Sequence, residues 1–254
     1  CGFDFTGSWA NTLILRRTTQ SGAQMSHINC NTLSMYGSNA QNRLIWFGSG
    51  PQRQPTNGYT ITAANLGTFQ YVDFVDTVAN GASAPWNLTA ITGLAGDGGG
   101  NQNISFATAQ TCYLVLSGSA YWDNASVWKT TSGGASSARI PLAHDNVVID
   151  SNSYTANDQL FILTSCLVGN VTASGVSKTN CHIGWSGTYI LRNFILDANL
   201  ITSNLSVTGH SFLNIYGDGT SNTYTLDTKG LVLEDNYYYV LDSGITNYTL
   251  SSNI

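Results

Sequence analysis

The sequence has 254 residues, of which 9% are charged, and its net charge at pH 7 is −5. Phosphate binding requires clustered Lys and Arg, so this composition argues against a nucleic-acid-binding protein. No apolar run approaches the roughly 20 residues of a membrane-spanning helix. Hydrophobic residues make up 42% of the chain, and because disordered chains are usually more polar and more charged, we expect this chain to fold.

The predicted elements are all strands. Short apolar or alternating runs recur along the chain, and clusters of Gly, Asn, Ser and Thr separate them. Such clusters are typical of turns, and no stretch shows a sustained apolar period of about 3.6 residues, which a helix would show. In chain order, the predicted strands cover residues 12–15, 43–47, 69–75, 146–150, 160–163, 211–216 and 237–241.

The corners between these runs favour a β-solenoid over a β-sandwich. Several runs end at a Gly or Asn corner, as a chain that coils around a narrow core requires. Hairpin signals are sparse, with Asn57-Gly58 and Asp218-Gly219 standing out, whereas a sandwich should contain more of them. The sandwich stays the alternative fold. Residues 42–61 and 204–226 are loosely similar, although chance similarity between β-rich stretches explains this equally well.

The most distinctive region lies in the middle of the chain. It begins with a Gly-rich loop that contains Asp and Asn (96–106), and it continues through two segments that each contain a Trp (121–124 and 128–135). The second of these segments includes Ser-Gly-Gly. An Arg-Ile-Pro segment follows (139–141), and then Asp-Asn-Val-Val-Ile-Asp (145–150). A strand that follows a proline and an Asp-Asn turn fits a new module starting there.

This central region resembles modules of phage structural β-solenoids and related surface adhesins, over about a fifth of the chain. The resemblance implies a tail-fibre, tailspike or capsid-decoration protein, folded as a right-handed parallel β-helix and located on a virion or extracellular surface. Residues 1–110 would be the C-terminal part of one β-solenoid module. Residues 111–254 would contain the Trp-containing junction and the start of a second module. The pattern carries no catalytic residues.

Trp122 and Trp128 can be interpreted in two ways. A module junction or a solenoid end must cover an open apolar core, and large aromatic side chains do this well. The alternative is a platform on which a sugar stacks, and we expect the capping role. Cut solenoid ends expose apolar core and unpaired strand edges, so Cys1 and Ile254 are expected to abut further protein, either more of a longer chain or neighbouring subunits.

No arrangement of chemically active side chains stands out, so we predict no catalytic, cofactor-binding or metal-binding residue. The sequence contains no Gly-x-Ser-x-Gly, P-loop or His-Glu-x-x-His motif. We expect the cysteines to be buried free thiols, with a Cys166–Cys181 disulfide as the alternative. The histidines and cysteines lack the spacing of metal ligands; they are His27, His144, His182 and His210, and Cys1, Cys30, Cys112, Cys166 and Cys181.

Acidic residues are the remaining candidates, because β-helical enzymes that depolymerise polysaccharides work with paired acids. Asp73 and Asp76 are three positions apart, which predicts opposite faces of one strand. Asp97 with Asn101 and Asn103 offers oxygen ligands for a calcium ion. A plain Gly-rich turn explains these three residues with fewer assumptions.

The sequence therefore predicts a non-enzymatic structural or adhesive component of a phage virion or surface fibre. A rigid, neutral surface rich in Tyr and Asn suits weak polar and stacking contacts with host glycans or proteins. The expected partners are other virion or fibre subunits, including copies of this chain in a trimer by analogy, and a host-surface glycan. No cofactor is expected. The alternatives are a glycan depolymerase on the same β-helix and, less favoured, a β-sandwich lectin or capsid-like domain.

Overall fold

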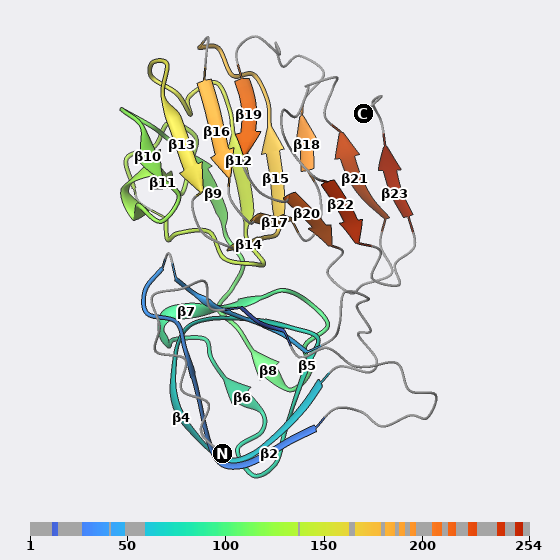
Figure 1. The fold of residues 1–254 in the computed structure, drawn as a ribbon. Coiled ribbons are helices and arrows are strands. Elements are labelled where there is room, and N and C mark those ends of the chain that lie inside the picture. Colours follow the sequence, from blue (N-terminus) through green and yellow to red (C-terminus); the bar gives the residue numbers. More distant parts are fainter. Residues whose placement is uncertain are drawn as a thin grey trace. The chain divides into compact units, whose positions relative to one another are not determined.

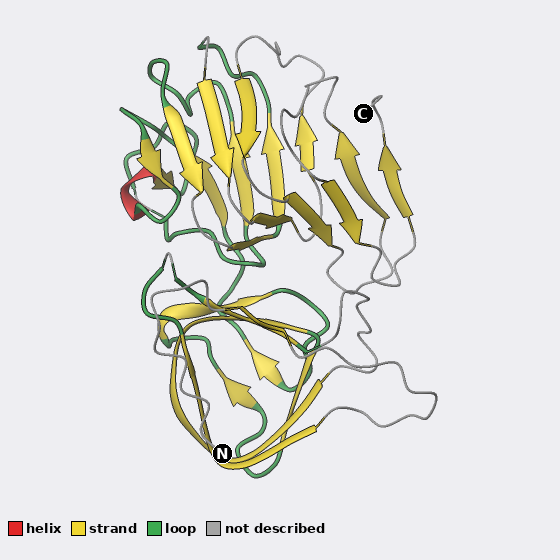
Figure 2. Ribbon diagram, viewed as in Figure 1, coloured by secondary structure: helices red, strands yellow, loops and turns green. Residues whose placement is uncertain are grey.

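The structure is a computed structural model, drawn as a ribbon in Figures 1 and 2. The predicted hairpin turns at Asn57-Gly58 and Asp218-Gly219 lie outside the residues that it describes, as do Cys1, His210 and Ile254. The predictions for these positions stay predictions. The described residues are 12–14, 27–40, 42–48, 59–136, 138–162, 166–178, 181–185, 188–190, 194–196, 205–209, 213–216, 223–227, 238–241 and 247–250.

The chain is all-β, as predicted. In the described ranges the only helix is a three-residue 3-10 helix, Ala125–Val127, and strands dominate the rest (Figure 2). Each predicted strand overlaps an observed strand. Strand β2 (His27–Tyr36) has no counterpart among the predicted strands, and the predicted strand 69–75 is the second half of β4 (Tyr59–Val75).

The chain divides into two compact units, which we describe separately. Their main division falls between Thr108 and Ala109, close to the predicted boundary at residue 110. Whether the units are two solenoid modules stays a prediction. The first unit comprises Cys1–Thr108, Gly217–Ser221 and Leu241–Ile245, and the second comprises Ala109–Tyr216, Asn222–Val240 and Thr246–Ile254.

A sheet built around β4 organises the first unit (Figure 1). β4 is 17 residues long, so its two halves have different partners. Residues 60–62 lie between β2 and β5 (Thr77–Asn80), and residues 72–74 lie between β3 (Leu44–Phe47) and β7 (Thr92–Asp97), with parallel pairing throughout. β1 (Thr12–Ile14) pairs with β3, and β6 (Trp86–Asn87) pairs separately with β8 (Ile104–Ser105).

Aromatic side chains fill the core of the first unit. Phe74 and Trp86 are fully buried, and Phe69 is nearly so. The ring centroids lie 5.8 Å apart in the Phe69–Trp86 pair and 6.1 Å apart in the Phe74–Trp86 pair. Trp46 packs edge-on against Tyr59 at 5.8 Å. Such contacts add about 0.5–1.5 kcal/mol each to the effect of apolar burial, so this core fixes β4 firmly in place.

The second unit contains three sheets, which strands β12 to β21 visit in turn (Figure 1). β12, β15, β18, β21 and β23 join β9 and β11 in a seven-stranded sheet. β13, β16 and β19 join β10 in a four-stranded sheet, and β14, β17, β20 and β22 form another. The bounds are β9 (Thr111–Leu114), β10 (Ala120–Tyr121), β11 (Trp128–Lys129), β12 (Asn146–Ile149), β13 (Gln159–Ile162), β14 (Cys166–Val168), β15 (Asn170–Ala173), β16 (Cys181–Trp185), β17 (Thr188–Ile190), β18 (Phe194–Leu196), β19 (Leu205–Gly209), β20 (Leu213–Tyr216), β21 (Thr223–Asp227), β22 (Tyr238–Leu241) and β23 (Asn247–Leu250).

From β12 to β17, the strand register of the second unit repeats every 22 to 25 residues. β12 to β18 each pair with the strand three elements later, and the β18–β21 register has a longer interval, because Phe194 pairs with Leu226, 32 positions later. Among the described registers of this unit, the one antiparallel pair is β9 with β11, and the seven-stranded sheet is therefore mixed. Paired residues 22 to 24 positions apart include Asn146 with Asn170, Gln159 with His182, and Cys166 with Thr188.

Alternating burial explains the core of the second unit. Successive side chains of a strand point to opposite faces, and every second residue of β9, β12 and β15 is buried. On the other face, Nδ2 of Asn170 donates to Oδ1 of Asn146 at 2.6 Å, which links two neighbouring strands. The buried residues of these three strands are Cys112, Leu114, Val147, Ile149, Val171 and Ala173.

The Trp-containing segment covers one end of this core. β11 is the edge strand of the seven-stranded sheet, and β10 is the edge strand of a four-stranded sheet. Trp122 is 8% exposed and Trp128 is fully buried. Their ring centroids are 4.5 Å apart, and Nε1 of Trp128 donates to the main-chain oxygen of Trp122 at 2.7 Å. Because both rings belong to the core, they support the capping role and offer no platform to a sugar.

Candidate functional site

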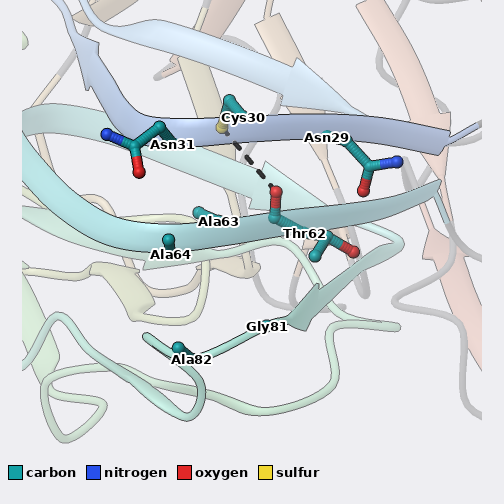
Figure 3. A pocket seen from close by; sticks show the side chains of 8 residues that line it. All are labelled: Asn29, Cys30, Asn31, Thr62, Ala63, Ala64, Gly81 and Ala82. Carbon is teal, nitrogen blue, oxygen red and sulfur yellow. Dashed lines mark hydrogen bonds between the residues drawn. The ribbon is translucent and has the colours of Figure 1, made fainter.

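A shallow groove on the first unit is the strongest candidate binding surface in the described part of the chain. It has a volume of about 370 Å³ and crosses β2, β4 and the end of β5 (Figure 3). Polar and small side chains line it, and none of them is charged. We call it the polar groove; its residues are Asn29, Cys30, Asn31, Thr62, Ala63, Ala64, Gly81 and Ala82.

The strand register arranges the groove residues in rows. Asn29 of β2 pairs with Thr62 of β4, and Thr62 pairs with Asn80 of β5 at the border of the groove. Asn29 and Asn31 lie on either side of Cys30, and both are exposed (Figure 3). Their side chains lie on the same face of β2, because residues two apart in a strand share a face. Neighbouring strands lie about 4.8 Å apart, so polar groups follow one another at this spacing across the groove.

Hydrogen bonds at one end of the groove hold this row in place. Nε2 of His27 lies 2.8 Å from Oδ1 of Asn29 and 3.1 Å from Oγ1 of Thr62. Nδ2 of Asn80 donates to Oγ1 of Thr62 at 3.4 Å. Asn31 instead accepts a hydrogen bond at its main-chain oxygen from Asn65, while its side-chain amide has no partner among the described residues. The groove thus combines fixed and unengaged polar groups.

Small residues keep the groove open. Ala64 and Ala82 are exposed, and their side chains end at Cβ. Gly81 has a φ of +92°, a conformation that strains any residue with a side chain. A Cβ at this position would lie 2.5 Å from the main-chain oxygen of Ala63. Only glycine therefore lets the chain approach β4 this closely.

Sequence reasoning assigned no function to these residues. The available signal was the run His27-Ile28-Asn29-Cys30-Asn31, in which polar residues alternate with apolar ones. This pattern predicts a strand with one exposed polar face. The rest of the groove comes from positions more than 30 residues later in the chain, which no local pattern brings together.

Asp73 and Asp76 do not lie on opposite faces of one strand, so that prediction was wrong. β4 ends at Val75, and Asp76 lies in the bend before β5, with a φ of +50°. Asp73 forms a bidentate ion pair with Arg43, in which Nε–Oδ2 is 2.9 Å and Nη2–Oδ1 is 2.7 Å. Both carboxyl groups are buried and therefore do not supply the accessible paired acids that a depolymerase needs.

Arg43, which directly precedes β3, links two further strands of the first unit, β4 and β7. Beyond the ion pair, Nη1 donates to the main-chain oxygen of Gly93 at 2.8 Å. Nη2 donates to the main-chain oxygens of Val72 and Leu94 at 3.2 and 3.0 Å. Gly93 and Leu94 both have positive φ values, so the guanidinium group stabilises an unusual bend in β7. The Arg43–Asp73 ion pair therefore has a structural role in the first unit.

Asp97, Asn101 and Asn103 serve the Gly-rich turn. Oδ1 of Asp97 accepts hydrogen bonds from Gly99 N and Asn101 Nδ2, at 2.8 and 2.7 Å. Oδ1 of Asn101 accepts from Thr77 N at 3.0 Å, whereas Asn103 donates to a different main-chain oxygen, that of Ala79. No group of three or more His, Cys, Asp or Glu side chains that could hold a metal ion occurs among the described residues.

A second Arg–Asp ion pair, between Arg139 and the buried carboxylate of Asp145, closes the loop before β12. Oδ1 of Asp145 accepts from Gln110 N and Arg139 Nη2, at 2.8 and 2.6 Å. Its Oδ2 accepts from Leu142 N and Arg139 Nε, at 2.8 and 3.1 Å. His144 is buried beside this ion pair, with Nε2 3.4 Å from Arg139 Nη2. All strong acceptor positions of Asp145 are thus used within the fold.

The described cysteines are free thiols: Cys30, Cys112, Cys166 and Cys181. The alternative of a Cys166–Cys181 disulfide was therefore wrong. Cys30 is half-buried and the other three are buried. The pKa of Cys112 is raised from 9.0 to about 12, mainly by burial and also by the charge of Asp145, while Arg139 opposes the shift. Burial is also the main cause that raises the pKa of Cys181.

The thiols should differ in reactivity. At pH 8, iodoacetamide is expected to modify Cys30 in the folded protein and to leave Cys112 unmodified, because alkylation requires an accessible thiolate. Peptide mapping by mass spectrometry over time measures both rates, with the urea-unfolded chain as the control in which both react. Equal rates in the folded protein would contradict the burial of Cys112.

The raised pKa of Cys112 also makes the stability of the protein depend on pH. The thiol form is favoured in the folded chain, so the contribution of Cys112 to the free energy of unfolding is fully present below pH 9 and is lost as the pH rises towards 12.

Comparison with known proteins assigns no family to the chain. No protein-family model matches it, and no curated protein or solved structure matches it either. In the described ranges, the structure contains no helix with the length and apolar character needed to span a membrane. The function must therefore be argued from the geometry of the chain itself.

Proposed function

We propose that the chain is a structural or adhesive component of a phage virion or a similar surface fibre, and that it presents a rigid, uncharged polar surface to a receptor or glycan. The observation that carries this proposal is the polar groove, an uncharged row of amide and hydroxyl groups on firmly packed parallel strands. Rigid strands lose little conformational freedom on binding, which favours the weak polar contacts of an adhesin.

The fold that we propose for this component is a right-handed parallel β-helix with two modules. Support comes from the parallel registers, from the visits of strands β12 to β21 to three sheets in turn, and from the interval of 22 to 25 residues between β12 to β17 and their partners. Crossovers between parallel strands are right-handed in about 98% of cases. A β-sandwich would instead require antiparallel sheets.

The proposed partners are other subunits of the virion or fibre, including two further copies of this chain in a trimer. The proposed location is a virion or extracellular surface. Light scattering of the purified chain, coupled to size-exclusion chromatography, is expected to give three times the chain mass of 27.1 kDa. A monomer at micromolar concentration would contradict the trimer, and an electron-microscopy map of the intact particle tests the location.

Glycan binding is the direct test of the adhesive function. The chain, made multivalent on streptavidin through a biotin tag, is expected to bind a subset of oligosaccharides on an array of microbial and host glycans. Multivalent display is needed because single contacts of this kind are weak. Streptavidin without the chain is the control. Absence of binding to every glycan and to intact host cells would contradict the adhesive function.

The depolymerase alternative gains no support from the acids that the sequence singled out, because Asp73 and Asp76 are buried. The same glycans can be incubated with the chain and assayed for new reducing ends or unsaturated products. Turnover would favour the depolymerase over the adhesin.

A further inference from the structure

We infer that the polar groove binds an uncharged saccharide, whose hydroxyl groups form hydrogen bonds with Asn29, Asn31 and Thr62. This inference rests on the proposed adhesive function, and it names the site and the ligand class for that function.

The chemistry of the lining favours sugar hydroxyl groups. The side-chain amides of Asn29 and Asn31 and the hydroxyl of Thr62 each offer both a donor and an acceptor. Neighbouring hydroxyl groups of a sugar offer the same combination, so donor and acceptor pairs can match. No lining residue is charged, and the chain has a net charge of −5, so a phosphate or an acidic sugar would gain no ion pair here. An apolar ligand would leave the amides without partners, which is unfavourable.

The spacing of the groove suits a chain of rings. Asn29, Thr62 and Asn80 follow one another on three parallel strands, at about 4.8 Å per strand. This spacing is close to the length that one pyranose ring adds to a polysaccharide. A short oligosaccharide lying across the strands could therefore meet a polar side chain at each successive ring.

His27 and Asn80 act as positioning residues. Their hydrogen bonds hold Asn29 and Thr62 in one arrangement before a ligand arrives, which reduces the entropy lost on binding. The side-chain amide of Asn31 has no partner among the described residues and extends from β2 beside Ala64 (Figure 3). One side of the groove is thus preorganised, and the other side offers the amide of Asn31 as donor and acceptor.

The other polar clusters of the described residues do not compete for this role. In the Arg43–Asp73 cluster, the carboxylate is buried and the guanidinium group forms five hydrogen bonds within the fold. In the Arg139–Asp145 cluster, both carboxylate oxygens are occupied by donors of the fold. The carboxylate oxygens of both clusters are thus engaged by donors of the fold.

Two variants test the groove without altering its buried residues. Asn31→Ala removes an exposed amide, and Ala82→Leu fills the groove with a larger side chain at an exposed position. Matched controls on the second unit are Asn157→Ala and Ala125→Leu, which alter exposed residues that do not line the groove. The probes are the neutral and acidic oligosaccharides of the glycan array, followed by titration of the strongest binder in solution. Melting temperatures verify that every variant is folded.

We expect Asn31→Ala to weaken binding of a neutral oligosaccharide by about tenfold, which corresponds to the loss of one or two net hydrogen bonds. Ala82→Leu should weaken it at least as much, and the controls should bind like the unmodified chain. If the chain binds glycans but neither groove variant changes the affinity, the inference is overturned while the adhesive function stands. Selective, salt-sensitive binding of acidic sugars would overturn the uncharged ligand, and absence of all binding would overturn the adhesive function itself.

Discussion

Replacing Arg43 with alanine is expected to lower the free energy of unfolding by about 3–5 kcal/mol, because removal of one partner leaves a buried charge without compensation. The side chains of Arg43 and Asp73 are only 7% and 2% exposed. The variant would also leave the main-chain oxygens of Val72, Gly93 and Leu94 without this donor. Urea denaturation measures the loss, and hydrogen exchange of β3, β4 and β7 should locate it in the first unit.

Two comparisons isolate the buried pair from a general effect of charge. Lys178→Ala removes an exposed cation and is expected to leave the melting temperature unchanged. Arg43→Met combined with Asp73→Leu should recover part of the stability, since apolar residues of similar size often replace a buried pair without loss. The recovery should be partial, because the three main-chain oxygens still lack a donor. An Arg43→Ala variant as stable as Lys178→Ala would show that the ion pair contributes nothing.

Replacing Trp128 with alanine is expected to destabilise the second unit by about 3–5 kcal/mol, the usual cost of truncating a large buried aromatic residue. The change removes a fully buried ring, its contact with Trp122, and the donor to the main-chain oxygen of Trp122. The resulting cavity lies between β11 and the core that it covers. Hydrogen exchange of β9 and β12 should therefore accelerate more than that of β4.

The neighbouring residue Tyr121 provides a matched aromatic control. It lies on β10, and its side chain is 50% exposed, so Tyr121→Ala is expected to change the melting temperature only slightly. Trp128→Phe should fall between the two, because it keeps an aromatic ring but loses the Nε1 donor. If Trp128→Ala and Tyr121→Ala melt at the same temperature, Trp128 does not act as a cap.

The internal repeat shows how much a closer reading of the sequence could have found. Asn146-Val-Val-Ile, Asn170-Val-Thr-Ala and Asn193-Phe-Ile-Leu begin 24 and 23 positions apart. The first two are register partners in the structure. The similarity between residues 42–61 and 204–226 drew attention to a different and looser pattern. A short motif of one polar and a few apolar residues recurs by chance in a β-rich chain. The spacing of this motif therefore indicates a repeat only when the strand register shows that its copies pair.

The candidate site could not be predicted from the sequence. The lining of the polar groove comes from residues 29–31, 62–64 and 81–82, and none of these segments contains a motif with its own chemistry. The acidic residues were the more obvious candidates for a functional site, because carboxylates are rare in this chain. Their burial and their partners depend on segments far away in the sequence, such as Arg43 for Asp73 and Gln110 for Asp145.

The sequence by itself determined that the chain is all-β and where most of its strands lie. Side-chain alternation and the preferences of β-branched, aromatic and turn-forming residues act between near neighbours, so they can be read locally. Only the tertiary structure decided which strands pair, why the two halves of β4 have different partners, and which side chains meet in the polar groove. These features depend on contacts between residues tens of positions apart, and a parallel pairing leaves no turn signal at the point where it forms.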